Sequence, residues 1–162
     1  MLIGKTTAAL GQGFRATGHG FKVFKIQFMK GYPQYGEVKA IKNTPNFELK
    51  QFGTPDLIAT PGDIDFEEGR KGMEFAEKII MSDEYDIVIL DEIGVAIEYG
   101  IVKIEDVLDL IDNKPEQVEL VLTGGPKMHP KIKERADLLT EMRMIKHYYS
   151  VKGIKARLGI EH

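Results

Sequence analysis

Short apolar runs alternate along the chain with segments of helical periodicity. The segment 5–16 is rich in alanine and leucine, and Gly18 and Gly20 follow it where a helix end favours glycine. Apolar positions three or four residues apart predict further helices over 66–81 and 104–112. Compact apolar or alternating runs predict strands, which we place at 21–28, 47–52, 86–90, 118–122 and 138–142.

The order of these elements predicts an α/β fold. Strands that are separated by helices favour a largely parallel sheet with helices on both of its faces. Glycine and proline lie between the elements and do not gather into a linker, and 162 residues is the size of one domain. We therefore expect a single domain over 1–162.

The amino-acid composition argues against several classes of function. A net charge of -3, from 22 basic and 25 acidic residues, gives no field that would attract a polyanion, so we expect no nucleic-acid partner. The sequence has no cysteine, which excludes disulfides, thiolate metal sites and a cysteine nucleophile. The longest apolar runs are about five residues, whereas a membrane helix needs about 20, and no signal-peptide pattern opens the chain. A cytoplasmic protein without membrane contact is expected.

The first helix begins with a phosphate-binding pattern. Gly4-Lys5-Thr6 matches the end of the Walker A motif, in which a loop opens directly onto a helix. Unpaired backbone N–H groups at the helix start point at a phosphate, Lys5 adds a cation, and the Thr6 hydroxyl is a ligand for Mg²⁺. The alternative interpretation is an ordinary helix start with an exposed lysine.

An acidic pair follows the strand predicted at 86–90. Asp91-Glu92 after a buried apolar strand is a Walker B pattern. Because ligands of open parallel sheets bind beyond the carboxyl ends of the strands, these carboxylates are expected at the same rim as Lys5. The alternative is a pair of solvated carboxylates that cap the next helix.

Segments spread in order over nearly the whole chain carry a family resemblance. They are Gly4-Lys5-Thr6-Thr7-Ala8-Ala9-Leu10, Gly18-His19-Gly20, Gln27-Phe28, Lys30-Gly31, Gly36-Glu37, Val88-Ile89-Leu90-Asp91-Glu92, Leu122-Thr123-Gly124, Ala136-Asp137-Leu138, Thr140-Glu141-Met142, Lys146-His147, Gly153-Ile154-Lys155-Ala156-Arg157 and Gly159-Ile160-Glu161. In these segments the sequence resembles the P-loop ATP:corrinoid adenosyltransferases. The resemblance implies a P-loop, RecA-like three-layer sandwich.

The resemblance also implies a reaction and the residues that carry it. In the family, Co(I) of a reduced corrinoid attacks the ribose 5' carbon of ATP and expels triphosphate. Lys5 and Glu92 are then the expected catalytic residues, and Gly4, Lys5, Thr6 and Thr7 are expected to bind the nucleotide. Thr6, Asp91 and Glu92 are expected to hold Mg²⁺ directly or through water. A homodimer and an electron-donating reductase are the expected partners.

The sequence departs from the family pattern in three places. Met1-Leu2-Ile3 stands where the family has the glycine-rich half of the phosphate loop, and the preceding central strand is missing. We interpret the chain as N-terminally incomplete; the alternative is a degenerate member of the family. The residues after Phe28 and the segment 54–60 correspond to covers of nucleotide and corrinoid, but 55–58 lacks the usual aromatic side chains. Gly125 replaces a usual arginine, with Lys127 nearby as a possible substitute cation.

Two other functions remain open at this point. One is a P-loop NTPase in which Glu92 positions water for attack on the γ-phosphate. The other is a noncatalytic nucleotide or corrinoid binder. No two histidines have metal-ligand spacing on one face, so a structural zinc site is not expected. His19 is expected at the surface, and Lys146-His147 is either a family motif or a solvated pair.

Overall fold

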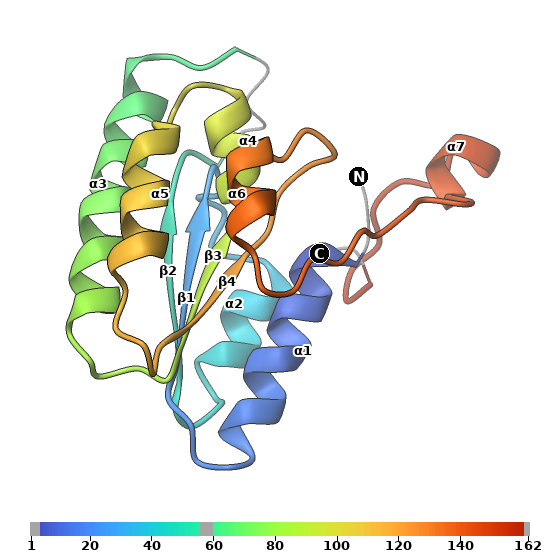
Figure 1. Ribbon diagram of the computed structural model, residues 1–162. Coiled ribbons are helices and arrows are strands. Elements are labelled where there is room, and N and C mark those ends of the chain that lie inside the picture. Colours follow the sequence, from blue (N-terminus) through green and yellow to red (C-terminus); the bar gives the residue numbers. More distant parts are fainter. Residues whose placement is uncertain (1–3, 56–59, 161–162) are drawn as a thin grey trace.

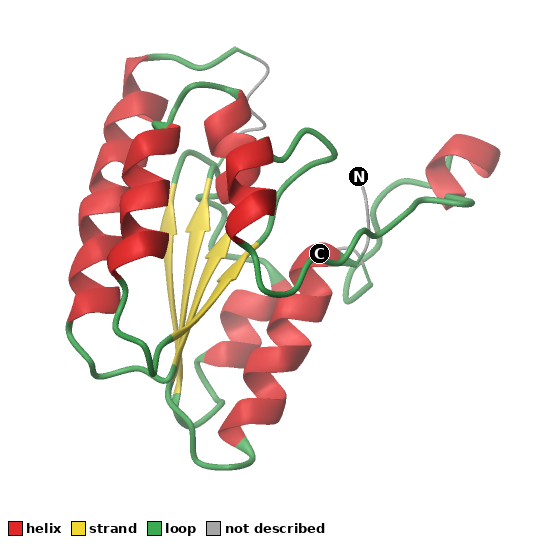
Figure 2. Cartoon of the chain, viewed as in Figure 1, coloured by secondary structure: helices red, strands yellow, loops and turns green. Residues whose placement is uncertain are grey.

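A four-stranded parallel sheet forms the centre of the protein. The computed structural model describes residues 4–55 and 60–160. All neighbouring strands run parallel, in the order β2-β1-β3-β4 (Figure 2). The strands are β1 (Val23–Phe28), β2 (Phe47–Phe52), β3 (Ile87–Asp91) and β4 (Glu119–Leu122).

Helices cover both faces of this sheet, as Figure 1 shows. One face carries α1 (Lys5–Thr17) and α2 (Gly36–Ile41). The other carries α3 (Asp63–Met81), α4 (Ile93–Glu98), α5 (Ile104–Asn113) and α6 (Pro130–Arg135). The three layers confirm the predicted α/β class. No helix of the described ranges is long and apolar enough to cross a membrane.

Alternation along β1 places different chemistry on the two faces. Successive strand residues point to opposite sides of a sheet. Phe24, Ile26 and Phe28 join the larger core, which α3, α4 and α5 cover. Val23 joins the smaller core under α1, so Lys25 and Gln27, at alternating positions after it, lie on the α1 side. Both polar side chains are fully buried.

The same alternation in β3 brings an acid to this face. Ile87 and Ile89 pack in the smaller core under α1, and Asp91, two residues further, ends the strand on the same side. In the parallel register Gln27 lies opposite Asp91. A polar patch therefore lies under the start of α1, at the carboxyl end of the sheet.

The strand predicted at 138–142 is wrong. After α6 the described chain leaves the sheet and has no strand there, and Leu138 is 86% exposed. A strand needs a neighbouring backbone to satisfy its N–H and C=O groups, and no strand of the described ranges pairs with 138–142. The predicted helix 66–81 begins earlier, at Asp63, because the Asp65 carboxylate accepts a 2.9 Å hydrogen bond from the Gly62 N–H and stabilises the first turn.

The chain after α6 runs past the start of α1 and then outward to α7 (Tyr148–Lys152), away from the sheet (Figure 1). It approaches the start of α1, where the Met142 sulfur lies 2.7 Å from the position that a Cβ on Gly4 would take. Much of its apolar surface is uncovered in the described chain. The large exposed apolar side chains are Leu138, Leu139, Met142, Met144, Ile145, Tyr148, Tyr149, Val151, Ile154, Leu158 and Ile160.

Candidate active site

The start of α1 presents unpaired backbone donors. Gly4 caps the helix with φ 137°, a conformation that favours glycine, and its carbonyl accepts a 2.7 Å bond from the Ala8 N–H. The N–H groups of Lys5, Thr6 and Thr7 have no acceptor within the helix. No described side chain forms a hydrogen bond or an ion pair with the Lys5 ammonium. This end of α1 is free to meet an anion.

Thr6 connects this helix start to the end of β3. Its hydroxyl donates a 2.9 Å hydrogen bond to Asp91 Oδ1, across 85 positions of sequence. The predicted meeting of the Walker A and Walker B segments at one rim of the sheet is therefore confirmed. The contact brings the oxygen atoms of two expected metal ligands together.

Asp91 is a fully buried carboxylate with partners on both oxygens. Thr123, just beyond β4, donates its hydroxyl to Oδ1 at 2.8 Å. Lys30 donates to Oδ2 at 2.9 Å, and Gln27 donates to the same oxygen at 3.3 Å. Burial alone would raise the pKa of Asp91, but the charges of Lys30 and Lys25 and the hydrogen bonds hold it well below its usual range. Asp91 is therefore an anion at neutral pH.

Lys25 supplies a second buried cation. Its ammonium forms an ion pair at 3.2 Å with Asp91 Oδ2, without the directional geometry of a hydrogen bond. Both side chains are 0% exposed. Burial lowers the pKa of Lys25, while the charge of Asp91 works in the opposite direction. The sequence analysis missed this residue, although a lysine inside the strand predicted at 21–28 was a signal, because strand interiors rarely bury a lysine without a partner.

Lys30 approaches Asp91 from the loop after β1. Met29 adopts a left-handed φ of 57°, which turns the chain back over the end of the sheet. Gly31 then crosses Gly53 so closely that a Cβ on Gly31 would lie 2.2 Å from the Gly53 carbonyl oxygen. Burial would lower the pKa of Lys30, but the charge of Asp91 and its hydrogen bond outweigh that effect, and the pKa is raised. The backbone thus fixes where Lys30 emerges.

A chain of amide hydrogen bonds extends the polar patch across the sheet. Gln51 of β2 donates to Gln27 Oε1 at 3.0 Å. The Gln27 amide nitrogen contacts Glu37 of α2 and Asp91, each at 3.3 Å. These bonds fix the Gln27 side chain, and through it they limit the orientations open to Asp91.

Glu92 lies beside Asp91 in a left-handed conformation, with φ 63°. Its backbone N–H donates to Thr123 Oγ1 at 2.9 Å. Within the described chain its carboxylate forms no capping hydrogen bond to α4, so the alternative interpretation of the acidic pair as a helix cap is wrong for this residue. The side chain is 23% exposed and lies 4.0 Å from the Lys30 ammonium.

Several other polar residues lie outside this site. Lys127 is 75% exposed and pairs with Glu98 at 2.8 Å. The ring nitrogens of His129 and His147 accept bonds from Lys131 and Tyr149 N–H groups and cap α6 and α7. The residues 1–3 and 56–59, which include most of the altered phosphate loop and of the segment 55–58, lie outside the described ranges.

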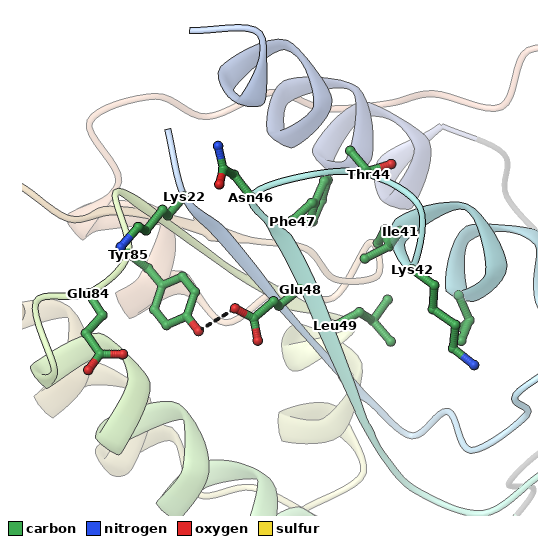
Figure 3. Close-up of a pocket in the computed structure, with 11 residues that line it drawn as sticks. Lys22, Ile41, Lys42, Thr44, Asn46, Phe47, Glu48, Leu49, Glu84 and Tyr85 are labelled. Carbon is green, nitrogen blue, oxygen red and sulfur yellow. Dashed lines mark hydrogen bonds between the residues drawn. The ribbon is translucent and has the colours of Figure 1, made fainter. Parts of the chain in front are cut away.

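A separate pocket lies at the opposite end of the sheet. Figure 3 shows it beside the beginning of β2, where the Tyr85 hydroxyl donates a 2.9 Å bond to Glu48. Burial and this bond raise the pKa of Tyr85 to about 12. Ligands of open parallel sheets bind at the carboxyl ends of the strands, so this pocket is not part of the rim site.

Comparison with known proteins identifies the family of this chain. The family described as "ATP:corrinoid adenosyltransferase BtuR/CobO/CobP" matches residues 3–162. The chain belongs to the ATP:corrinoid adenosyltransferase family. This membership confirms the resemblance inferred from the sequence.

Curated relatives of this adenosyltransferase carry the same description. The corrinoid adenosyltransferase of Escherichia coli (strain K12) is 32% identical over 160 residues, which cover 98% of this chain and 80% of the relative. That of Sinorhizobium sp is 34% identical over 169 residues, covering 98% and 75%. That of Pseudomonas aeruginosa is 31% identical over 160 residues, covering 98% and 78%.

The oxygen atoms at the rim of this adenosyltransferase suit a hard cation. Among the described residues no three His, Cys, Asp or Glu side chains gather into a metal site. The oxygen atoms that approach Lys30 come from two carboxylates, Asp91 and Glu92, and from the Thr6 hydroxyl. Thr6, Asp91 and Glu92 all face one positive charge, the Lys30 ammonium, at 3.4, 2.9 and 4.0 Å. These three side chains therefore already surround a position that holds a positive charge. Oxygen ligands of this kind, completed by water and phosphate, are those that Mg²⁺ prefers.

Proposed function

We propose that this protein transfers the 5'-deoxyadenosyl group of ATP to Co(I) of a corrinoid and releases triphosphate. Membership of the adenosyltransferase family supports the reaction class and the corrinoid substrate. The 2.9 Å contact between Thr6 and Asp91 carries the residue-level proposal, because it joins the phosphate-binding and acidic segments at one rim. The family description and the free helix start of α1 support ATP as the adenosyl donor.

Lys5 and the first amides of α1 have the role of holding the triphosphate. Negative charge grows on that group as the bond from its oxygen to the 5' carbon breaks. Donors that already point at the developing charge lower the barrier, and loss of one such donor elsewhere costs about 10² to 10³ in rate. Lys5 suits this role because no described side chain neutralises it. Gly4 and Thr7 complete the proposed nucleotide-binding set.

Thr6, Asp91 and Glu92 are the proposed Mg²⁺ ligands, directly or through water. When bound, Mg²⁺ supplies positive charge that offsets the charge of the triphosphate. Thr6 contributes its hydroxyl oxygen, Asp91 contributes a carboxylate whose lowered pKa keeps it ionised at neutral pH, and Glu92 contributes a partly exposed carboxylate that faces the site. Glu92 is proposed as catalytic because it is the one carboxylate of the pair with access to solvent at the rim.

Orientation is the other contribution of the protein. The nucleophile is the cobalt of the substrate, so the side chains need not supply one. Fixing two reactants within attack distance elsewhere contributes several kcal/mol. The hydrogen-bonded chain from Gln51 through Gln27 to Asp91 keeps the acidic end of β3 in place for this purpose.

Subunit pairing and cellular partners form a separate part of the proposal. The uncovered apolar side chains after α6 support a homodimer in which a second copy covers them. A reductase that supplies Co(I), and a cytoplasmic location where that reductant is available, follow from the proposed chemistry. Light scattering on the purified protein tests the dimer: a monomeric mass would contradict it.

The decisive assay incubates the protein with ATP, Mg²⁺ and a chemically reduced corrinoid in the dark. The proposal predicts a corrinoid that carries a cobalt–carbon bond, seen by its absorption spectrum and by its reversal in light. Turnover of ATP with no change in the corrinoid would support the NTPase alternative. Absence of both reactions, together with corrinoid or nucleotide binding, would support the noncatalytic alternative.

A further inference from the structure

The Lys30 ammonium lies at the point where the three proposed metal ligands meet. It is 2.9 Å from Asp91 Oδ2, 3.4 Å from Thr6 Oγ1 and 4.0 Å from Glu92 Oε1. We propose that Lys30 is an exchangeable internal cation, which holds the metal position in the nucleotide-free protein and leaves it when Mg²⁺ enters with ATP. This inference rests on the proposed function, since it assigns a state to the same site.

Exposure separates Lys30 from the other cation on Asp91. The Lys30 side chain is 20% exposed, whereas Lys25 is 0% exposed. Lys30 emerges from a loop at the rim, so its flexible four-carbon stem can swing toward solvent while the backbone stays in place. Lys25 lies under α1 within the sheet and has no such path. Of these two ammonium groups, Lys30 is the one that can exchange.

The backbone around Lys30 is built to place this side chain. Met29 is held at a left-handed φ of 57°, which costs energy for a residue other than glycine. Gly31 and Gly53 cross in contact, so the loops after β1 and β2 fix each other. These two features fix the point at which the Lys30 side chain leaves the backbone.

Like charges prevent Lys30 and a divalent cation from sharing the position. Two cations within about 4 Å in a partly buried site repel each other by several kcal/mol. A free metal ion must therefore displace Lys30 from its nearest anion, Asp91, and leave it with the weaker attraction of Glu37. A metal ion that arrives with a polyphosphate brings a new partner for the displaced ammonium. Lys30 thereby makes metal binding depend on nucleotide.

The test measures binding of Mn²⁺ alone, as a paramagnetic substitute for Mg²⁺, by electron paramagnetic resonance without nucleotide. Lys30→Met keeps the length of the side chain and removes its charge. We expect this variant to bind Mn²⁺ about tenfold tighter than the wild type, or more. Lys127→Met is the matched control, because Lys127 forms a single exposed ion pair with Glu98 away from the site. The control is expected to leave the Mn²⁺ affinity unchanged.

Further variants keep the inference falsifiable. Lys30→Arg retains the charge and is expected to bind Mn²⁺ as weakly as the wild type. Adding Asp91→Asn to Lys30→Met is expected to abolish the increase in Mn²⁺ affinity. If Lys30→Met unfolds, refolding on addition of Mn²⁺ supports the inference, and failure to refold overturns it. An affinity of folded Lys30→Met equal to or weaker than that of the wild type also overturns it.

The same experiment separates this inference from the proposed function. Wild-type protein that binds Mg²⁺ with ATP, together with an unchanged Mn²⁺ affinity in Lys30→Met, would refute the exchange and leave the function intact. A tighter Mn²⁺ site in Lys30→Met, with a wild type that binds Mg²⁺ and ATP but transfers no adenosyl group, would support the exchange and remove the proposed function.

Discussion

The substitution Asp91→Asn tests how far the ion pairs of Asp91 with Lys25 and Lys30 stabilise the folded protein. The substitution keeps the shape of the side chain and much of its hydrogen bonding, but it removes the counter-ion of two lysines. Lys30 is 20% exposed and can turn to solvent, whereas Lys25 is 0% exposed and cannot. The cost of the substitution therefore falls on Lys25, which becomes a buried cation without a partner.

The size of this cost follows from the geometry. At the observed 3.2 Å between Lys25 Nζ and Asp91 Oδ2, the attraction is about 5 kcal/mol for an effective dielectric constant of about 20. Removing one partner of a buried pair costs about 3 to 5 kcal/mol elsewhere. Lys25 can also avoid the penalty by losing its proton, which from an unfolded pKa of about 10.4 costs about 4.6 kcal/mol at pH 7. We expect a loss of about 3 to 5 kcal/mol at pH 7.

The deprotonation route gives the effect a pH dependence. A lysine whose folded pKa is lowered binds fewer protons when folded than when unfolded, so stability rises as pH approaches the unfolded pKa. At pH 9 the cost of deprotonating Lys25, which sets the largest loss of stability, falls to about 2 kcal/mol, because pH 9 is closer to the unfolded pKa of about 10.4. The difference in free energy of unfolding between the wild type and Asp91→Asn is therefore expected to shrink from pH 7 to pH 9.

Urea unfolding followed by far-ultraviolet circular dichroism measures these differences. Asp91→Asn combined with Lys25→Met removes the stranded amine and is expected to recover most of the loss. The reasoning is refuted if Asp91→Asn stays within about 0.5 kcal/mol of the wild type at pH 7, a range typical of neutral surface changes. It is equally refuted if the gap does not shrink at pH 9, or if Lys25→Met brings no recovery.

Three further changes test separate parts of the structure. Lys5→Ala is expected to lower kcat for adenosyl transfer about 100-fold, and a change below about threefold would exclude Lys5 from the phosphate site. Thr6→Val, which removes the hydroxyl, is expected to weaken binding of Mg²⁺ with ATP in calorimetry, and Thr6→Ser to retain it; equal affinities would contradict the metal role. Gly31→Ala is expected to destabilise by about 1 to 3 kcal/mol in urea unfolding, because its Cβ would meet the Gly53 carbonyl. The matched change Gly11→Ala, which meets open space on α1, is expected to stabilise by about 0.5 to 1 kcal/mol, and the same sign for both would contradict the packing.

The sheet and its rim could be predicted because their signals are local and periodic. Apolar runs near β1, β2, β3 and β4 fixed the strands to within two residues, and their separation by helices predicted parallel pairing. The meeting of Thr6 with Asp91 followed from the rule that carboxyl ends of parallel strands share one rim. The predicted family is confirmed as well. The roles assigned to Lys5, Thr6, Thr7, Asp91 and Glu92 stay predictions.

The missed features depend on contacts between distant segments. Lys25 looked like one polar residue in a strand, and only its register against β3 shows that it faces Asp91. Lys30 belonged to a motif of the family resemblance, but its contacts depend on the left-handed turn at Met29. The apolar run 138–142 has the composition of a strand, yet no strand in the described part of the chain pairs with it, and periodicity alone cannot reveal a missing neighbour.

The central claim is that the rim formed by Lys5, Thr6 and Asp91 holds the triphosphate of ATP while the adenosyl group moves to cobalt. Phosphorus nuclear magnetic resonance of the products, with reduced corrinoid in excess over ATP, tests it most directly. The account predicts intact triphosphate in equal amount to the adenosylated corrinoid, with both products lost together in Lys5→Ala. ADP and orthophosphate as the only phosphorus products would contradict it.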